Sequence, residues 1–410
     1  MQLRALLTAE TPLSFRDGVD LASPELNRYI PGSAILGALA EAHARLRADP
    51  AMFARLFLQE QVRFGNAYPT AFATEKLTRT DYLPVRPVPL SARSGKRFVG
   101  FRYDDPDKVE RYVGVTDALI PLALFALSGE ARSDLLESVR TYGVGDDAIE
   151  LDRIGGFYRR GSEPGEIGRA QVDFDLRTRT GINYRTGTVQ QAILYSTQVL
   201  PEGTSFWGSW SIPDDDAALR TSLEQLVDEL AEAGMFRLGN NRTRGFGRVT
   251  ARLDDDDSDT SIALAERVAT FTALLDTAAA AAGLDIPAGI YLPVSLVSDA
   301  LFHDALLRPR LQLHPDDLAV AGVAGAELVF HTAAARRVRG WSMLLGLPRA
   351  DTWAIGMGAV FLFRLPAGFA GWDALLRFQE RGVGLRRAEG YGQISLADPF
   401  HLELAGGVMA

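Results

Sequence analysis

The chain has 410 residues, of which 47% are hydrophobic and 23% are charged, and its formal net charge is −9. These values are typical of a soluble globular protein of two domains, and no apolar run reaches the roughly 18–20 residues that span a bilayer. The sequence has no cysteine, which excludes disulfides and thiolate metal sites and favours a cytoplasmic location, with no metal or other cofactor expected.

The first half of the chain alternates strand and helix patterns. Residues 1–7 predict a first strand and not a signal peptide, because no small-residue cleavage site follows them. A Pro-Gly turn then leads into an amphipathic helix, where we expect Ser33 to cap the first turn. Further strands are predicted at residues 192–196, 205–210 and 248–253, and a helix at residues 217–233. Residues 65–170, rich in proline, glycine and charge, predict an insertion with small elements of its own, including a helix near residues 134–140.

An acidic run at residues 254–259 predicts a domain boundary. In the second half we expect helices around residues 268–275 and 372–378, and strands at residues 290–297, 327–330, 359–363 and 391–396. Both halves start and end in strands with helices between them. This pattern predicts an α+β fold of two tandem ferredoxin-like (RRM-like) units, residues 1–253 with the insertion and residues 260–410.

Each half of the chain has one basic, glycine-rich turn just before its last strand. Loop 1 (residues 237–249) contains four arginines and no acid, and loop 2 (residues 382–394) repeats the arrangement but contains Glu389. Glycines let a backbone approach a ligand closely, and arginines pair with phosphate. We therefore expect RNA contact, above all in loop 1. A plain hairpin with solvated arginines is the alternative for loop 1, and a structural or subunit-contact role competes for loop 2.

The order of several motifs resembles a known family. Residues 29–37 followed by residues 244–247 look like the RAMP superfamily of CRISPR-associated proteins, whose members have RRM-like folds and a glycine-rich loop on crRNA. Residues 64–69 resemble the family's strand after the first helix, and residues 179–196 its hairpin over RNA. Segments at residues 340–342, 354–360, 387–392 and 398–401 are similar to Csx-ten, the Cas-five-group RAMP subunit of type III-D effector complexes.

The resemblance implies a non-catalytic subunit of an antiviral complex that caps the 5′ handle of the crRNA. Its expected partners are the Cas-ten large subunit and the Cas-seven-like backbone subunits, with target RNA contacted indirectly. The candidates for RNA contact are Ser33 at the helix start; Arg177, Arg179, Asn183 and Arg185 on the hairpin region of residues 176–210; Arg242, Arg244, Gly245, Phe246, Gly247 and Arg248 in loop 1; and Arg386, Arg387, Gly390, Tyr391 and Gly392 in loop 2.

Two ribonuclease hypotheses remain as alternatives. Asp17 and Asp20 lie between the first strand and the first helix, where RAMP subunits that cut target RNA carry an aspartate, although loop aspartates beside glycine are commonly turn formers. His43 lies close to the catalytic histidine position of RAMP enzymes that process crRNA, although a helix-face histidine without a partner is commonly structural. We find no Ser-His-acid, zinc-hydrolase, Walker or dinucleotide spacing.

Overall fold

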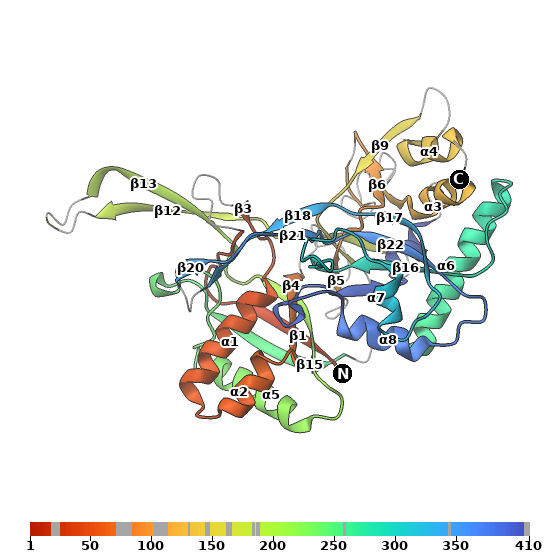
Figure 1. Cartoon of the computed structure of the whole chain (residues 1–410). Helices are drawn as coiled ribbons and strands as arrows, with labels where there is room; N and C mark the ends of the chain where they lie inside the picture. The colour runs from red at the N-terminus through yellow and green to blue at the C-terminus, as the bar shows by residue number, and fades with distance from the viewer. Residues whose placement is uncertain are drawn as a thin grey trace.

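Two four-stranded antiparallel sheets form the centres of the two halves of the chain (Figure 1). The computed structural model describes residues 1–17, 25–70, 84–97, 99–101, 114–129, 132–143, 148–160, 166–182, 185, 189–256, 260–342 and 346–405. Within these ranges no helix has both the length and the apolar character that crossing a membrane requires.

The first sheet is built from strands that are far apart in the sequence. Its order is β15 (Val249–Asp255), β1 (Gln2–Ala9), β14 (Ser205–Ser211) and β4 (Arg63–Pro69). Leu3, Ala5 and Leu7 alternate along β1 and are buried against the helices on one face. These helices are α1 (Gly32–Leu46), α2 (Pro50–Phe57) and α5 (Ala217–Glu232). The helices predicted after the Pro-Gly turn and at residues 217–233 are confirmed as α1 and α5.

The second sheet repeats the same strand order. It runs β17 (Glu327–Thr332), β22 (Val360–Leu365), β16 (Ile290–Leu296) and β23 (Ile394–Leu396). The helices of this half are α6 (Ser261–Ala281), α7 (Pro315–Ala319), α8 (Trp372–Arg381) and α9 (Pro399–Glu403). Because Val360 and Leu362 pack with residues of α6 while Phe361 and Phe363 pack with residues of α8, the central strand β22 is apolar on both faces. In both sheets the first strand lies between the third and the fourth, which confirms the α+β, ferredoxin-like class.

The region between β4 and β12 forms small sheets and helices that lie beside the second sheet (Figure 1). Its elements are β5 (Val85–Pro87), β6 (Ala92–Gly95), β7 (Val115–Asp117), α3 (Leu119–Ser128), α4 (Ser133–Arg140), β8 (Thr141–Tyr142), β9 (Ile149–Arg153), β10 (Phe157–Arg160) and β11 (Ile167–Ala170). The predicted helix near residues 134–140 is confirmed as α4. The predicted start of the insertion, near residue 65, falls inside β4.

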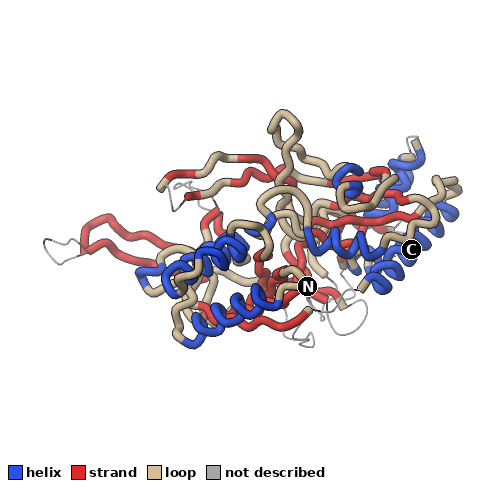
Figure 2. The backbone as a smooth tube through the Cα atoms, turned by 60° about the horizontal axis from the view of Figure 1, so that its bottom comes forward, coloured by secondary structure: helices blue, strands red, loops and turns tan. Residues whose placement is uncertain are grey.

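A hairpin connects the second and third sheet strands in each half. The first is β12 (Asp175–Ile182) with β13 (Val189–Val199), which projects from the body of the chain (Figures 1 and 2). The second is β18 (Ala335–Val338) with β21 (Thr352–Ile355), extended by β19 (Trp341–Ser342) and β20 (Leu347–Pro348). The two halves therefore share a third feature besides sheet order and glycine loop.

Candidate nucleic-acid interface

Loop 1 contains a short 3₁₀ turn between two residues in the left-handed region. The turn, η3 (Arg242–Arg244), follows Asn241 at φ 60° and precedes Gly245 at φ 86°. The Leu238 amide donates to the Gly247 carbonyl over 2.8 Å and closes the base of the loop. A Cβ on Gly247, whose φ is 94°, would lie 2.4 Å from the Leu238 carbonyl oxygen. Glycine is required there, so the local sequence specifies the shape of the loop.

Loop 2 has the same backbone geometry. Its turn, η4 (Arg387–Glu389), follows Arg386 at φ 59° and precedes Gly390 at φ 88°. The Val383 amide donates to the Gly392 carbonyl over 2.8 Å. Since the two loops match position for position, the paired glycine loops seen in the sequence form one structural motif used twice.

Each loop is anchored by backbone hydrogen bonds to the segment that follows the first strand of its own sheet. The donor–acceptor pairs are Asn240–Ser14 and Gly247–Pro12 for loop 1, and Leu385–Leu301 and Gly392–Asp299 for loop 2. Amides that bond to the protein itself are not free to bind an anion. Side chains, more than the backbone of the loops, therefore supply the chemistry available to a ligand.

Loop 1 presents its arginines to solvent. Arg244 and Arg248 are exposed and Arg242 is half-buried. Arg242 pairs with Glu41 of α1 over 2.8 Å, and Arg248 pairs with Glu10 over 2.6 Å. The hydrogen bond from Arg242 lowers the pKa of the Glu41 carboxyl. Exposed pairs of this kind stabilise a protein by at most about 1 kcal/mol, so a phosphate oxygen can replace either carboxylate at little cost.

The first hairpin meets loop 1 at Phe246. The ring is only 7% exposed, and the Arg179 guanidinium of β12 lies 4.5 Å from its centroid. Phe246 is therefore a support for Arg179, not an open platform for a base. A guanidinium held over a ring in this way can still stack on a base or pair with phosphate through its remaining surface. This contact makes the hairpin and loop 1 one continuous basic surface.

The rest of the hairpin adds charge to that surface. Arg177 is exposed and lies 3.7 Å from the carboxylate of Asp175, and Arg185 is exposed near the end of the hairpin. Asn183 lies outside the described residues. The structure thus places Arg177, Arg179 and Arg185 on a single projecting element.

Loop 2 has different surroundings from loop 1, because it packs against the first half of the chain. Gly390 contacts the Phe64 carbonyl of β4 and the backbone of Gly32 at the start of α1. Inside the loop, Arg386 donates to both carboxylate oxygens of Glu389 over 2.9 and 2.6 Å. We call this contact zone between loop 2 and the α1–β4 region the seam. Here loop 2 holds the two halves together.

The remaining candidates of loop 2 also make contacts within the chain. Arg387 pairs with Glu60 over 3.0 Å, and Arg386 lies 4.8 Å from the centre of the Tyr391 ring. Arg349, from the second hairpin, pairs with Glu389 over 3.0 Å. The carboxylate of Glu389 therefore binds two arginines, Arg386 and Arg349, within the chain.

The predicted cap at Ser33 is wrong. The N-cap of α1 is Pro31, without a side-chain cap bond, and Ser33 lies within the first turn. The Gly32 amide instead donates to the Asn66 side-chain oxygen over 2.9 Å. Asn66 of β4, distant in the sequence, thus accepts a first-turn amide hydrogen bond that Ser33 was expected to accept. Ser33 lies directly beside the seam.

Comparison with known proteins identifies the family. The RAMP superfamily profile matches residues 6–250. The chain belongs to the RAMP superfamily. No curated protein matches it.

Two of the solved structures similar to this RAMP chain are chains of type III assemblies. One is a chain in the cryo-EM structure of the type III-B Cmr-beta bound to cognate target RNA and AMPPnP, with 14% identity, a TM-score of 0.40, and coverage of 88% of this chain and 86% of that one. Another is a chain of the Csm3–Csm4 subcomplex in the type III-A CRISPR-Cas interference complex, with 12% identity, a TM-score of 0.36, and coverage of 89% and 94%.

His43 is buried in the RAMP chain. His43 is 2% exposed, and its ring lies 5.8 Å from the rings of both Phe53 and Phe57. Burial lowers the pKa of the imidazole, which favours its neutral form. Asp17 lies in β2 (Arg16–Asp17), which pairs with β3 (Glu25–Leu26), and Asp20 lies outside the described residues. The burial of His43 supports the structural alternative over a catalytic base.

The RAMP fold also assembles a chain of polar groups that the sequence analysis missed. His401 lies 2.7 Å from the Ser295 hydroxyl through Nε2 and 2.7 Å from the Asp117 carboxylate through Nδ1. All three residues are buried, with exposures of 0% to 6%. Because they come from α9, β16 and β7, no local spacing could reveal them. Their burial suits a structural link between the insertion and the second sheet.

Proposed function

We propose that this RAMP chain is a non-catalytic crRNA-binding subunit of a type III-D-like CRISPR effector complex, and that it holds the 5′ handle of the guide. The contact between Arg179 and Phe246 carries the proposal, because it joins the arginines of the hairpin to those of loop 1. An RNA strand lying along this surface would meet a series of guanidinium groups. Because guanidinium groups make up this surface, its main contribution is to phosphate binding.

The division of labour between the loops supports this assignment. In loop 1, the partners of Arg242 and Arg248 are exposed or half-buried carboxylates outside the loop. In loop 2, Arg386 binds an acid of the loop itself. We therefore assign crRNA contact to loop 1 and the hairpin, and we assign loop 2 to the seam. On this proposal the partners are the Cas-ten large subunit and Cas-seven-like backbone subunits.

The test is RNA affinity as a function of salt. Fluorescence anisotropy of labelled crRNA carrying the handle is measured with the wild-type chain and with the double variant Arg242→Ala, Arg244→Ala. Removing two phosphate contacts on single-stranded RNA should flatten the slope of log K against log salt by about 1.4 and weaken binding at every salt concentration. The matched control is Arg308→Ala, an arginine 71% exposed on a turn of the second half.

Two results would count against the proposal. An unchanged affinity and slope in the double variant would remove loop 1 from the RNA interface. Magnesium-dependent cleavage of target RNA by the assembled complex, lost in Asp17→Ala, would contradict the non-catalytic part.

A further inference from the structure

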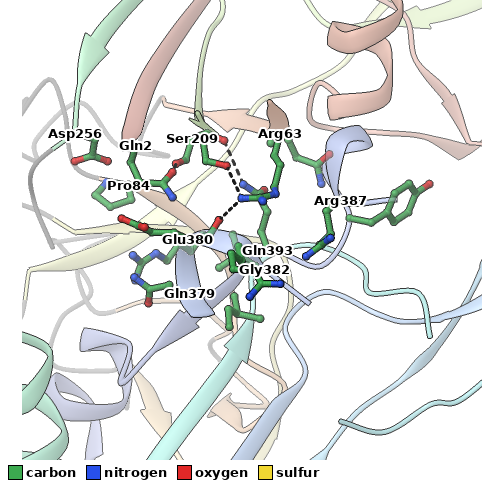
Figure 3. A pocket seen from close by; sticks show the side chains of 18 of the residues that line it. Gln2, Arg63, Pro84, Ser209, Asp256, Gln379, Glu380, Gly382, Arg387 and Gln393 are labelled. Carbon is green, nitrogen blue, oxygen red and sulfur yellow. Dashed lines mark hydrogen bonds between the residues drawn. The ribbon is translucent and has the colours of Figure 1, made fainter. Parts of the chain in front are cut away.

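A cavity of about 130 Å³ lies where the seam meets the open face of the first sheet (Figure 3). Strands β4 and β14 line it from the first half, and the end of α8 and loop 2 line it from the second. The helices of the first half cover the other face of that sheet. The cavity is therefore a feature of the contact between the halves.

Four arginines line this cavity, and three of them surround the seam: Arg63 on β4, Arg381 at the end of α8 and Arg387 in loop 2. The fourth, Arg86, pairs with Asp398, and the carboxylates of Asp256 and Glu380 also line the cavity. Figure 3 shows Arg63 and Arg387 reaching it from different ribbons. Within the described part of the chain, neither Arg63 nor Arg381 forms an ion pair with a carboxylate. Two neutral oxygens, the Ser211 hydroxyl and the Glu380 carbonyl, accept from Arg63 at 3.3 Å each, which is long for a charged donor.

Buried donors around the cavity also lack acceptors. The Nε atoms of Arg63 and Arg387 and the indole Nε1 of Trp207 have no hydrogen-bond partner among the described residues. Leaving such a donor unsatisfied is costly, and the group gains from any acceptor brought near it. These three donors of the cavity therefore remain available to an acceptor.

The charges around Arg63 also favour a bound anion. Burial lowers the pKa of its guanidinium, and repulsion by Arg387 and Arg381 lowers it further. Glu60 and Glu380 offset part of this effect. An anion placed among the three guanidinium groups would relieve the repulsion between them.

We propose that this cavity binds a single phosphate group, either free inorganic phosphate or the phosphate of a small nucleotide. Its size suits such a group, since a cavity of roughly 150 Å³ accommodates benzene in another protein. Guanidinium forks match the oxygens of phosphate. Because Arg63 belongs to the first half and Arg381 and Arg387 to the second, the bound anion bridges the halves. This site is separate from the proposed RNA surface and does not depend on it.

The experiment measures thermal unfolding and calorimetric binding of the full chain with inorganic phosphate, in parallel with chloride at matched ionic strength. We expect phosphate, but not chloride, to raise the melting temperature, because a ligand of the folded state stabilises it. Arg381→Gln changes an exposed side chain, so it should fold normally, and it should weaken phosphate binding about tenfold. Glu380→Gln removes a nearby negative charge and should strengthen binding. The control is Arg308→Gln, which should bind phosphate as the wild type does.

The outcomes separate the sources of the phosphate. Tighter binding of adenosine monophosphate than of inorganic phosphate would assign the site to a nucleotide, and the reverse order would assign it to the free ion. Displacement of phosphate by a short RNA would overturn the small-ligand assignment in favour of an RNA backbone. Equal effects of phosphate and chloride, or phosphate binding that Arg381→Gln and Glu380→Gln both leave unchanged, would remove the site altogether. The loop 1 variant Arg242→Ala, Arg244→Ala should bind phosphate as the wild type does, even when it no longer binds RNA.

Discussion

Replacing Gly32 with alanine tests whether the seam between the two halves contributes to stability. A Cβ at this position would lie 1.9 Å from the Phe64 carbonyl oxygen, 2.9 Å from the Glu389 carbonyl oxygen and 3.0 Å from the Gly390 Cα. All three are backbone atoms, so no rotamer change can relieve the clash. Overpacking costs typically 1–3 kcal/mol, and we expect Gly32→Ala to lower the free energy of unfolding by about 3 kcal/mol.

Gly37 provides a matched control in the same helix. A Cβ at Gly37 has nothing within 4 Å, and the residue is exposed. Gly37→Ala should therefore stabilise the protein by up to about 1 kcal/mol, the gain of alanine over glycine inside a helix. Urea unfolding of the two variants, followed by tryptophan fluorescence, should differ by about 4 kcal/mol. Equal stabilities for Gly32→Ala and Gly37→Ala would refute the close packing of α1 against β4 and loop 2.

Three further predictions concern charged groups. Burial raises the pKa of Glu389, but the hydrogen bonds and the charge of Arg386 lower it more. The stabilising effect of the Glu389 carboxylate is therefore present above the unfolded pKa and is lost as the pH falls through the folded pKa. Glu389→Gln should therefore cost about 1.5–3 kcal/mol in urea unfolding at pH 7 and less near pH 3. Burial lowers the pKa of His401, but the charge of Asp117 raises it more. The protonated ring therefore stabilises the fold fully below the unfolded pKa, and this stabilisation is lost as the pH rises through the folded pKa. His401→Gln should abolish that part of the pH dependence, and an unchanged profile between pH 6 and 9 would contradict it. Arg179→Ala should weaken handle binding in anisotropy and flatten the salt slope by about 0.7, whereas Arg179→Lys should restore the slope without full affinity.

The elements of the fold could be predicted wherever one face of a helix or strand is apolar. The helix at residues 217–233 is α5, because Leu219, Leu223 and Leu230 recur at helical spacing and bury one side. The buried strand β22 was equally visible as a continuous apolar run. The prediction that Ser33 caps α1 failed because the side chain of Asn66, a residue distant in the sequence, accepts the Gly32 amide in the first turn of that helix.

The site shows the same limit. The resemblance to the RAMP family predicted Arg179 and Phe246 as RNA contacts, but only the fold revealed that the guanidinium of Arg179 lies over the ring of Phe246. His43 looked available on its helix, yet Phe53 and Phe57 enclose it. Accessibility depends on packing between segments, and no local pattern encodes it.

The sequence by itself determined the shape of both glycine loops. Positive φ angles at Gly245 and Gly390, and the close contacts of Gly247 with Leu238 and of Gly392 with Val383, require glycine wherever the loops are placed. Only the tertiary structure decided that the two loops have different surroundings. Loop 1 faces solvent beside the hairpin, while loop 2 packs against Gly32 and pairs Arg386 with Glu389 of the loop itself. The physical reason is that backbone conformation is a local property, whereas the partner of a charge is whichever group the rest of the fold brings within reach.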